Sequence, residues 1–571
     1  MNIKIKTTIA ACMAMPLLGS CLEETFPSSS MTQEQVEQSA SSLEALNNAM
    51  ARQLMTLGQD YSSIGYPGIM LSLDVAAGEL PVTSTSYDYF PWYANDTYLG
   101  ETGLTIYDWW AMYSNLIHCA NLVIKAAPQS SEASVKELGY LGNALAYRAM
   151  AYMDMVRLYE YKHTGVQSLD AKAETTGVYK LTVPLVTENT TEAESRNNPR
   201  QPFYVMYRFI MGDLDRAEVY LQGTNYSTYN MADAAVVAGL KARLWLEMGS
   251  RFTLYPEDLS TMLAHEDDES MQQYPKLGVG SAKECFAKAA TYARMAINEG
   301  ATPLTKEEWH DTKTGFNTAN HAWLWAEQIS TDDVSSSSWA YFSVVGIMSP
   351  EASYGVAEST YGATRMIDAS LYATIEDGDW RKATWIAPAD AGNPQKAASY
   401  STQLDGEQWS SYPAYSGFKF RPGKGDMNNY KTGVATDIPL MRVEEMYLIE
   451  AEGLAHSQGV SAGVRALEKY INKYRYDNNS YQCTAADIDK FTDEILRQRR
   501  IEFWGEGIVG YDYKRLEKAV VKKYDGSNHP ESYQNNTLDG YVAPRFNLCF
   551  PQSSEMLYNS ALKNNPDPGV Q

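Results

Sequence analysis

The side chains with the most distinctive chemistry in this sequence are aromatic rings that stand beside polar groups in segments without helical periodicity. One such run ends before residue 97 and contains Tyr87, Tyr89, Trp92, Tyr93, Asn95 and Asp96. A second run follows the serines at 335–338 and contains Trp339, Tyr341, Tyr354 and Tyr361. Tyr and Trp combine an apolar face with a hydrogen-bonding edge, which matches a sugar ring with its apolar C–H face and its rim of hydroxyl groups. Such rings beside polar side chains favour a glycan, either an oligosaccharide or a polysaccharide, as the class of ligand. Packing in the core is the alternative for any single ring.

The overall composition agrees with a neutral ligand. The chain has 41 Tyr and 12 Trp against 14 Phe, whereas a core that needed only apolar bulk would use Phe. The formal net charge of -23 repels phosphate backbones, so we expect no nucleic-acid partner. Solubility is the commoner reason for such an excess of acidic residues.

The sequence carries no recognisable catalytic motif. Glycosidic hydrolysis needs two carboxylates about 5–9.5 Å apart, and a chain with 70 acidic residues contains such pairs by chance. The patterns H-E-x-x-H and G-x-x-x-x-G-K do not occur. G-x-S-x-G occurs once, at 459–463, but between two predicted helices and without the preceding strand that a nucleophile elbow requires. We therefore predict a protein that is not an enzyme, and a surface glycoside hydrolase is the alternative from another class.

Metal-binding and redox patterns are also missing from the sequence. The seven His are scattered and no C-x-x-C pair occurs, so we predict no metal and no cofactor. The acidic run 265–269 could meet Ca²⁺ but lacks the EF-hand spacing, and a solvated loop is the simpler interpretation. Four cysteines of the body are predicted to be buried thiols, with a disulfide as the alternative for an exported protein: Cys119, Cys285, Cys483 and Cys549.

The N-terminus has the three parts of a bacterial lipoprotein signal. Lys4 and Lys6 precede an apolar run at 9–18, and Leu-Gly-Ser at 18–20 leads directly to Cys21. We expect residues 1–20 to be removed and Cys21 to carry the lipid, with 21–33 as a tether. The acidic pair after Cys21 resembles the signal that directs Bacteroidetes lipoproteins to the outer face of the outer membrane. No later apolar run approaches the ~18 residues of a membrane span, so only the lipid would hold the protein at the membrane.

Helical periodicity indicates the scaffold that must position the aromatic rings. Apolar residues recur at spacings of three and four in seven segments: 137–160, 203–221, 231–248, 281–299, 442–457, 462–474 and 491–504. Gly249 and Gly300 are predicted to end two of these helices. Helices of this length joined by short turns predict a mainly α protein of stacked antiparallel hairpins, similar to tetratricopeptide repeats.

Two long segments interrupt this pattern. Residues 60–108 and 305–439 are rich in Gly, Pro, Tyr and Ser, and only 321–328 alternates like a strand. Long irregular segments on a rigid scaffold are usually functional. The expected organisation is a helical region at 34–300 and a second region at 301–571 with ligand loops and closing helices.

Several of these segments together resemble the SusD/RagB family. The run 438–452 (IPLMRVEEMYLIEAE) is similar to a family helix, and the run 498–515 is similar to the family's E-R-x-x-E-L-x-x-E-G-x-R-x-x-D-L-x-R pattern. Gln498, Phe503 and Val509 depart from that pattern. Asp379-Trp380-Arg381 and the tail at 550–566 match more weakly, and Gln552-Ser553 breaks the tail motif.

This resemblance implies a SusD-like α-α superhelix that acts as a lid over a TonB-dependent SusC-like outer-membrane transporter. Family members capture oligosaccharides, or in some cases peptides, and pass them inward without hydrolysis. A peptide-binding RagB-like protein is therefore a second alternative. Family members use aromatic residues from the loop before a helix that here contains Trp110 and Tyr113, and from loops in the second half of the chain. The resemblance therefore implies that the two aromatic runs described above contact the ligand. The charged residues of the motifs, Arg442, Glu445, Arg499, Glu502 and Glu506, are predicted to clasp helices together rather than to catalyse a reaction.

Overall fold

The computed structural model describes residues 40–55, 64–82, 90–96, 99–128, 133–224, 226–335, 343–355, 357, 363–401, 404 and 406–569. The predicted signal peptide, Cys21 and the tether lie outside these residues. So do four predicted ligand contacts, Tyr89, Trp339, Tyr341 and Tyr361. Of Trp92 only the backbone is described.

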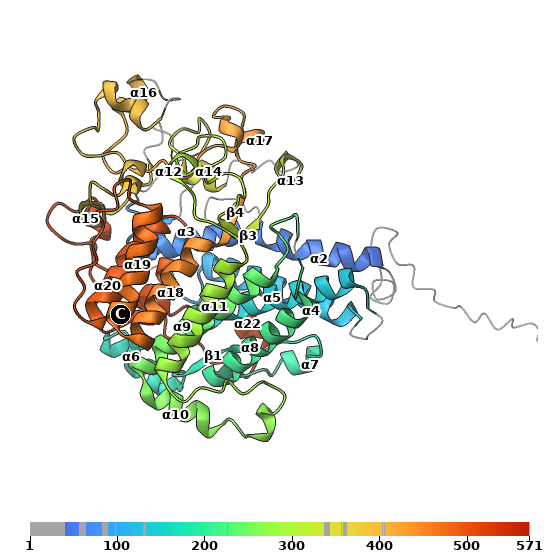
Figure 1. Cartoon of the computed structure of the whole chain (residues 1–571). Coiled ribbons are helices and arrows are strands. Elements are labelled where there is room, and N and C mark those ends of the chain that lie inside the picture. The colour runs from blue at the N-terminus through green and yellow to red at the C-terminus, as the bar shows by residue number, and fades with distance from the viewer. Residues whose placement is uncertain are drawn as a thin grey trace, which may run out of the picture.

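Nine long helices among the described residues form the body of the molecule (Figure 1). They are α2 (Ala40–Leu54), α4 (Leu104–Ala126), α5 (Val135–Tyr159), α8 (Phe203–Tyr220), α9 (Ala234–Leu254), α11 (Ala282–Asn298), α18 (Val443–Gln458), α19 (Val460–Tyr474) and α20 (Ile488–Glu502). Each packs on the next in a continuous series from α2 to α19, and α20 packs on α18. This arrangement confirms the predicted mainly α fold of stacked helices.

Local chemistry explains most of the helix ends. Ser134 caps α5 in a reciprocal capping box with Glu137, and Gly300 takes a positive φ of 108° just after α11. The prediction that a helix ends at Gly249 is wrong, because α9 continues to Leu254. A Cβ at Gly249 would lie 3.0 Å from the Phe286 ring. This glycine therefore lets α11 approach α9 closely rather than ending the helix.

Two further boundaries differ from the predictions. Residues 438–442 form β4 (Ile438–Arg442), which pairs antiparallel with β3 (Trp323–Glu327), so the helix of the first family motif starts only at Val443. The strand predicted at 321–328 is confirmed. Inside the segment 60–108, predicted to be irregular, α3 (Tyr66–Ala77) is buried along its whole length. A helix buried on all sides has no polar face, so it leaves no periodic signal.

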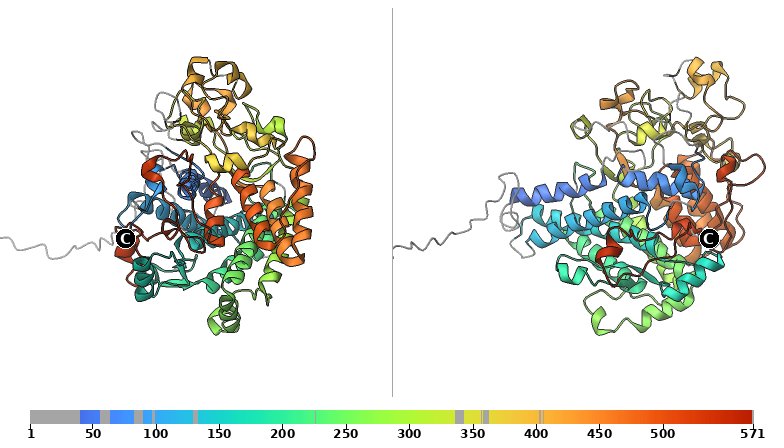
Figure 2. Two further views of the ribbon diagram at one scale, coloured as in Figure 1. Left: turned by 90° about the vertical axis from the view of Figure 1, so that its left-hand side faces the viewer. Right: turned by 180° about the vertical axis from the view of Figure 1, so that it is seen from behind.

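The remaining elements are short. They are η1 (Phe90–Ala94), α6 (Gln167–Thr176), β1 (Leu181–Pro184), α7 (Glu192–Ser195), β2 (Arg200–Pro202), α10 (Pro256–Ala264), η2 (Glu269–Met271), α12 (Lys306–Trp309), α13 (Thr331–Ser335), α14 (Val344–Met348), α15 (Ala369–Thr374), η3 (Trp380–Thr384), η4 (Pro394–Ser399), α16 (Gly406–Ser410), η5 (Gly423–Gly425), α17 (Tyr430–Gly433), α21 (Val509–Leu516), η6 (Glu531–Tyr533), η7 (Pro544–Phe546) and α22 (Glu555–Tyr558). The elements from α12 to α17 stand together at one end of the helical body, as Figure 2 shows from two further sides.

One main hydrophobic core joins both halves of the chain, and its members run from Leu43 to Leu562. None of the helices among the described residues is long and apolar enough to cross a bilayer.

The charged residues of the second family motif meet inside this core. Glu502 ends α20 with no exposed side-chain surface, and Glu506 lies in the turn that follows. Arg442 reaches both, donating to Glu506 at 2.8 Å and to Glu502 at 3.1 Å. Arg499 donates to Asp512 at 2.6 Å. These contacts hold together α20, α21 and β4, which agrees with the predicted structural role.

Candidate functional site

The described part of the first predicted aromatic run, residues 90–96, contains η1 and precedes α4 by seven residues. Tyr93 is 1% exposed, and its ring stacks on Trp109 with centroids 5.6 Å apart. Phe90 is equally buried. Residues i and i+3 of a 3₁₀ turn lie on the same side, so both rings face the core. The structure thus gives Tyr93 a packing position instead of the predicted contact with a ligand.

The polar residues of this run are anchored by the C-terminal part of the chain. Asn95 and Asp96 are half-buried, and Arg545 donates to Asp96 Oδ1 at 3.3 Å. Lys522 donates to the carbonyl oxygen of Ala94. Burial, together with the nearby Arg545 guanidinium, lowers the pKa of Lys522 to about 6. The segment that carries the predicted rings is therefore fixed at its C-terminal end.

Two described residues next to the predicted runs are in contact with each other. The Arg365 guanidinium lies over the Phe90 ring at 5.5 Å from its centroid. Phe90 directly follows Tyr89, and Arg365 stands four positions after Tyr361. Tyr354 is half-buried and donates to the carbonyl oxygen of Asp426 at 3.2 Å. We use the name aromatic loop surface for the segments 87–96 and 335–361, in which the sequence predicts the ligand contacts.

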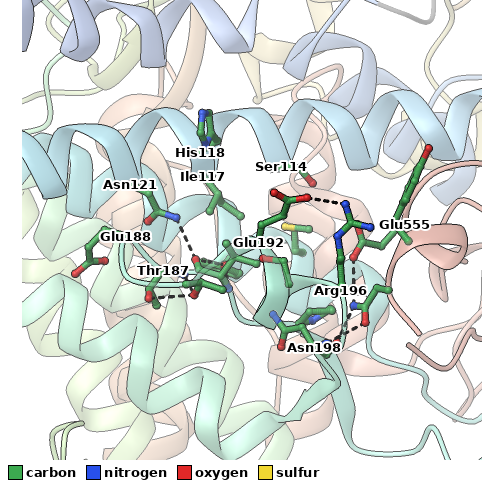
Figure 3. Close-up of a pocket in the computed structure, with 18 of the residues that line it drawn as sticks. Ser114, Ile117, His118, Asn121, Thr187, Glu188, Glu192, Arg196, Asn198 and Glu555 are labelled. Carbon is green, nitrogen blue, oxygen red and sulfur yellow. Dashed lines mark hydrogen bonds and ion pairs between the residues drawn. The ribbon is translucent and has the colours of Figure 1, made fainter. Parts of the chain in front are cut away.

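A cavity of about 670 Å³ that the sequence did not predict opens between α4 and the C-terminal segment (Figure 3). We call it the α4–α22 pocket. It is lined by Trp110, Ser114, Ile117, His118, Asn121, Leu122, Lys125, Tyr152, Met155, Pro184, Val186, Thr187, Glu188, Thr190, Glu192, Ser195, Arg196, Asn198, Glu555, Tyr558 and Asn559. Its volume lies within the range of small-molecule sites.

One wall of the pocket is held by a buried arginine. Arg148 makes two hydrogen bonds of 2.7 Å to Asp213, and its remaining nitrogen donates to Asn121 at 2.7 Å and to Glu188 at 2.6 Å. Asn121 in turn donates to the carbonyl oxygen of Val186 at 3.2 Å. The segment after β1 is thereby fixed against α4 and α5.

The opposite wall joins residues that are far apart in sequence. The backbone N–H of Asn198 donates to Asn559 at 3.0 Å, and the Asn559 amide donates back to the Asn198 carbonyl at 2.7 Å. Trp110 donates its indole N–H to Glu555 at 3.2 Å. Burial raises the pKa of Glu555, although the hydrogen bonds from Asn559 and Trp110 oppose this shift.

The sequence could not show this pocket as a site. Trp110 and Ile117 are nearly buried, at 8% and 5% exposed, so in the sequence they look like ordinary core residues of an apolar helix face. The other walls come from 184–198 and 555–559. The one available signal was the polar stripe Ser114, Asn121 and Lys125 along α4, which an exposed helix face would also show.

The acidic run 265–269 and the four cysteines are the other features that the sequence singled out. In the acidic run, Asp268 accepts from His265 at 2.7 Å and Asp267 pairs with Lys276. The described residues hold no group of three or more His, Cys, Asp or Glu that could bind a metal. The four body cysteines are free thiols: Cys285 and Cys549 are buried, whereas Cys119 and Cys483 are half-buried.

Comparison with known proteins supports the resemblance to the SusD/RagB family. Residues 298–566 match the model of the SusD family. A SusD-like carbohydrate-binding protein from Bacteroides vulgatus has the same fold, with a TM-score of 0.65 and 20% identity over 91% of this chain and 97% of the other. A SusD superfamily protein from Bacteroides thetaiotaomicron gives a TM-score of 0.62 and 19% identity over 92% and 99%.

A third solved structure is described as a complex with a xylogluco-oligosaccharide. Its TM-score is 0.57, with 16% identity over 90% of this chain and 97% of that one. No curated protein matches the chain in sequence.

Proposed function

Because residues 298–566 match the SusD family and the chain has the SusD-like fold along nearly its whole length, we propose that this protein binds a glycan at the cell surface without hydrolysing it. The observation that carries the proposal is the SusD-like fold, whose relatives include a carbohydrate-binding protein and a xylogluco-oligosaccharide complex. The two aromatic segments that the sequence predicts as ligand contacts support it. The helical body supplies a rigid support for these segments.

We further propose where the protein lies in the cell. The lipid on Cys21 anchors the protein to the outer face of the outer membrane, and the captured glycan passes to a SusC-like TonB-dependent transporter. The lipoprotein signal at 9–21 and the acidic pair that follows it support this location.

Binding at the aromatic loop surface is expected to be weak. Stacking of a ring on a base contributes about 1–3 kcal/mol, and we take this as an upper bound for a sugar. Two rings and a few exposed hydrogen bonds then give roughly -4 to -7 kcal/mol, which corresponds to dissociation constants from about a millimolar to tens of micromolar. Weak capture suits a protein that must release its ligand to a transporter.

The double variant Trp92→Ala/Trp339→Ala tests the capture surface. We expect glycan affinity to fall at least about tenfold, since two stacking rings are lost, with an unchanged melting temperature. Affinity electrophoresis and differential scanning fluorimetry measure the two quantities.

Two controls accompany this variant. Tyr541→Ala removes a ring that is 40% exposed and packs near Gly165, and it should leave glycan binding unchanged. Tyr93→Ala removes the buried ring on Trp109 and should lower the melting temperature. If the double variant binds glycan as tightly as the wild type, the aromatic loop surface is not the site.

A further inference from the structure

We propose that the α4–α22 pocket is a second carbohydrate site, which takes a neutral stretch of a polysaccharide whose other part is held at the aromatic loop surface. This inference rests on the proposed function and adds a separate place of contact. The elements α12–α17 and the pair α7 and α22 occupy different parts of the molecule in all the views (Figures 1 and 2). Helix α4 links the two sites, because it starts eight residues after Asp96 and lines the pocket from Trp110 to Lys125.

The shape of the pocket suits a chain rather than a single sugar. Trp110 and Lys125 are 15 residues apart on one helix, which corresponds to roughly 22 Å of length. Two more hollows, of about 640 and 420 Å³, share Thr187 and other residues of the segment 185–198 with the pocket. All three hollows therefore border this segment.

The charges of the pocket favour a neutral ligand. Arg196 is paired with Glu192 at 2.6 Å, and the Glu188 carboxylate accepts from Arg148. Burial favours the uncharged form of Glu555. Lys125 is exposed at one end, where water screens its charge. An anionic ligand would also meet the field of a chain with a net charge of -23.

The lining groups match the surface of a polyol. Ile117, Met155 and Val186 provide apolar surface, whereas Ser114, Thr190 and Asn198 combine donors with acceptors. Figure 3 shows Ile117 and Asn121 directed from α4 toward Thr187, with Glu192, Arg196 and Glu555 on the other side. Tyr558 lies at the pocket with 63% of its surface exposed, so its ring is available for stacking.

The walls are already formed without a ligand. The reciprocal hydrogen bonds between Asn198 and Asn559 and the four bonds of Arg148 fix the segments that face each other across the cavity. A preformed site loses little conformational entropy on binding.

Two protein sites that bind the same polysaccharide chain increase its affinity through avidity. The second contact becomes intramolecular once the first has formed, which raises the affinity for a long polymer but not for a fragment that reaches one site only. The pocket therefore predicts a dependence on ligand length.

The test uses Ser114→Trp, which fills the pocket from α4, and Tyr558→Ala, which removes the exposed ring. Leu557→Ala is the matched control, because Leu557 is 69% exposed on the same short helix and does not line the pocket. The probes are neutral polysaccharides (xyloglucan, xylan, glucomannan and starch) in affinity gels, and short oligosaccharides from the polymer that retards the intact chain most.

Both pocket variants should lose polymer affinity by roughly fivefold or more, keep oligosaccharide affinity and melt like the wild type. The control should match the wild type throughout. If both pocket variants keep their affinity for the polymer, this inference is wrong but the proposed function still stands. If they lose affinity for polymer and oligosaccharide equally, the pocket is not a separate second site. If no polymer retards the intact chain, the proposed function fails and this inference fails with it.

Discussion

Replacing Glu502 with alanine is expected to lower the free energy of unfolding by about 3–5 kcal/mol, because it leaves buried charges without a counterion. Glu502 has no exposed surface and accepts from Arg475 at 2.8 Å through both oxygens, from Arg381 at 2.9 Å and from Arg442 at 3.1 Å. Burial alone would raise the pKa of Glu502, but the Arg475 and Arg442 guanidiniums outweigh it and hold that pKa well below its usual range.

The loss of stability extends beyond one ion pair, because the three arginines also bind other carboxylates. Arg381 also binds Asp379 at 2.6 Å, and Arg475 also binds Glu444 at 3.1 Å. Chemical denaturation monitored by circular dichroism measures the change. Glu192→Ala removes one partner of an exposed pair and should leave the denaturation midpoint unchanged. A Glu502→Ala protein as stable as the wild type would show that this network does not hold the C-terminal helices together.

Replacing Cys21 with serine should release the protein from the membrane. The thiol is the acceptor of the predicted diacylation, and each buried CH₂ of an acyl chain contributes about 0.8 kcal/mol to membrane binding. Detergent phase partitioning of cell fractions should move the variant from the detergent phase to the aqueous phase.

The matched control for this experiment is Cys119→Ser, since Cys119 is a half-buried free thiol in α4. It should partition like the wild type. If the Cys21→Ser protein stays in the detergent phase, the lipoprotein assignment is wrong.

Periodicity predicted the scaffold well where helices have two different faces. The apolar stripes at 137–160 and 203–221 predicted α5 and α8, and both predicted ends of each helix lie within two residues of the observed ends. Periodicity did not reveal α3, which is buried on all sides. A helix end was wrongly predicted at Gly249, whose role depends on Phe286 in another helix. A local pattern cannot show which neighbour a glycine must accommodate.

The candidate sites were less accessible to prediction. Aromatic composition indicated where rings gather, but the direction of Tyr93 depends on the register of a single 3₁₀ turn. The α4–α22 pocket joins α4 to residues as distant as Asn559. Such a cavity exists only after folding has brought these segments together.

Incubation of the soluble ectodomain with a panel of glycans and peptides tests the central claim most directly. Native affinity electrophoresis measures binding, and chromatography of the incubated glycans measures release of products. We predict a mobility shift with at least one glycan and no released products. Released oligosaccharides would identify a glycoside hydrolase, and a shift with peptides alone would identify a peptide-binding protein; either result would contradict non-catalytic glycan capture.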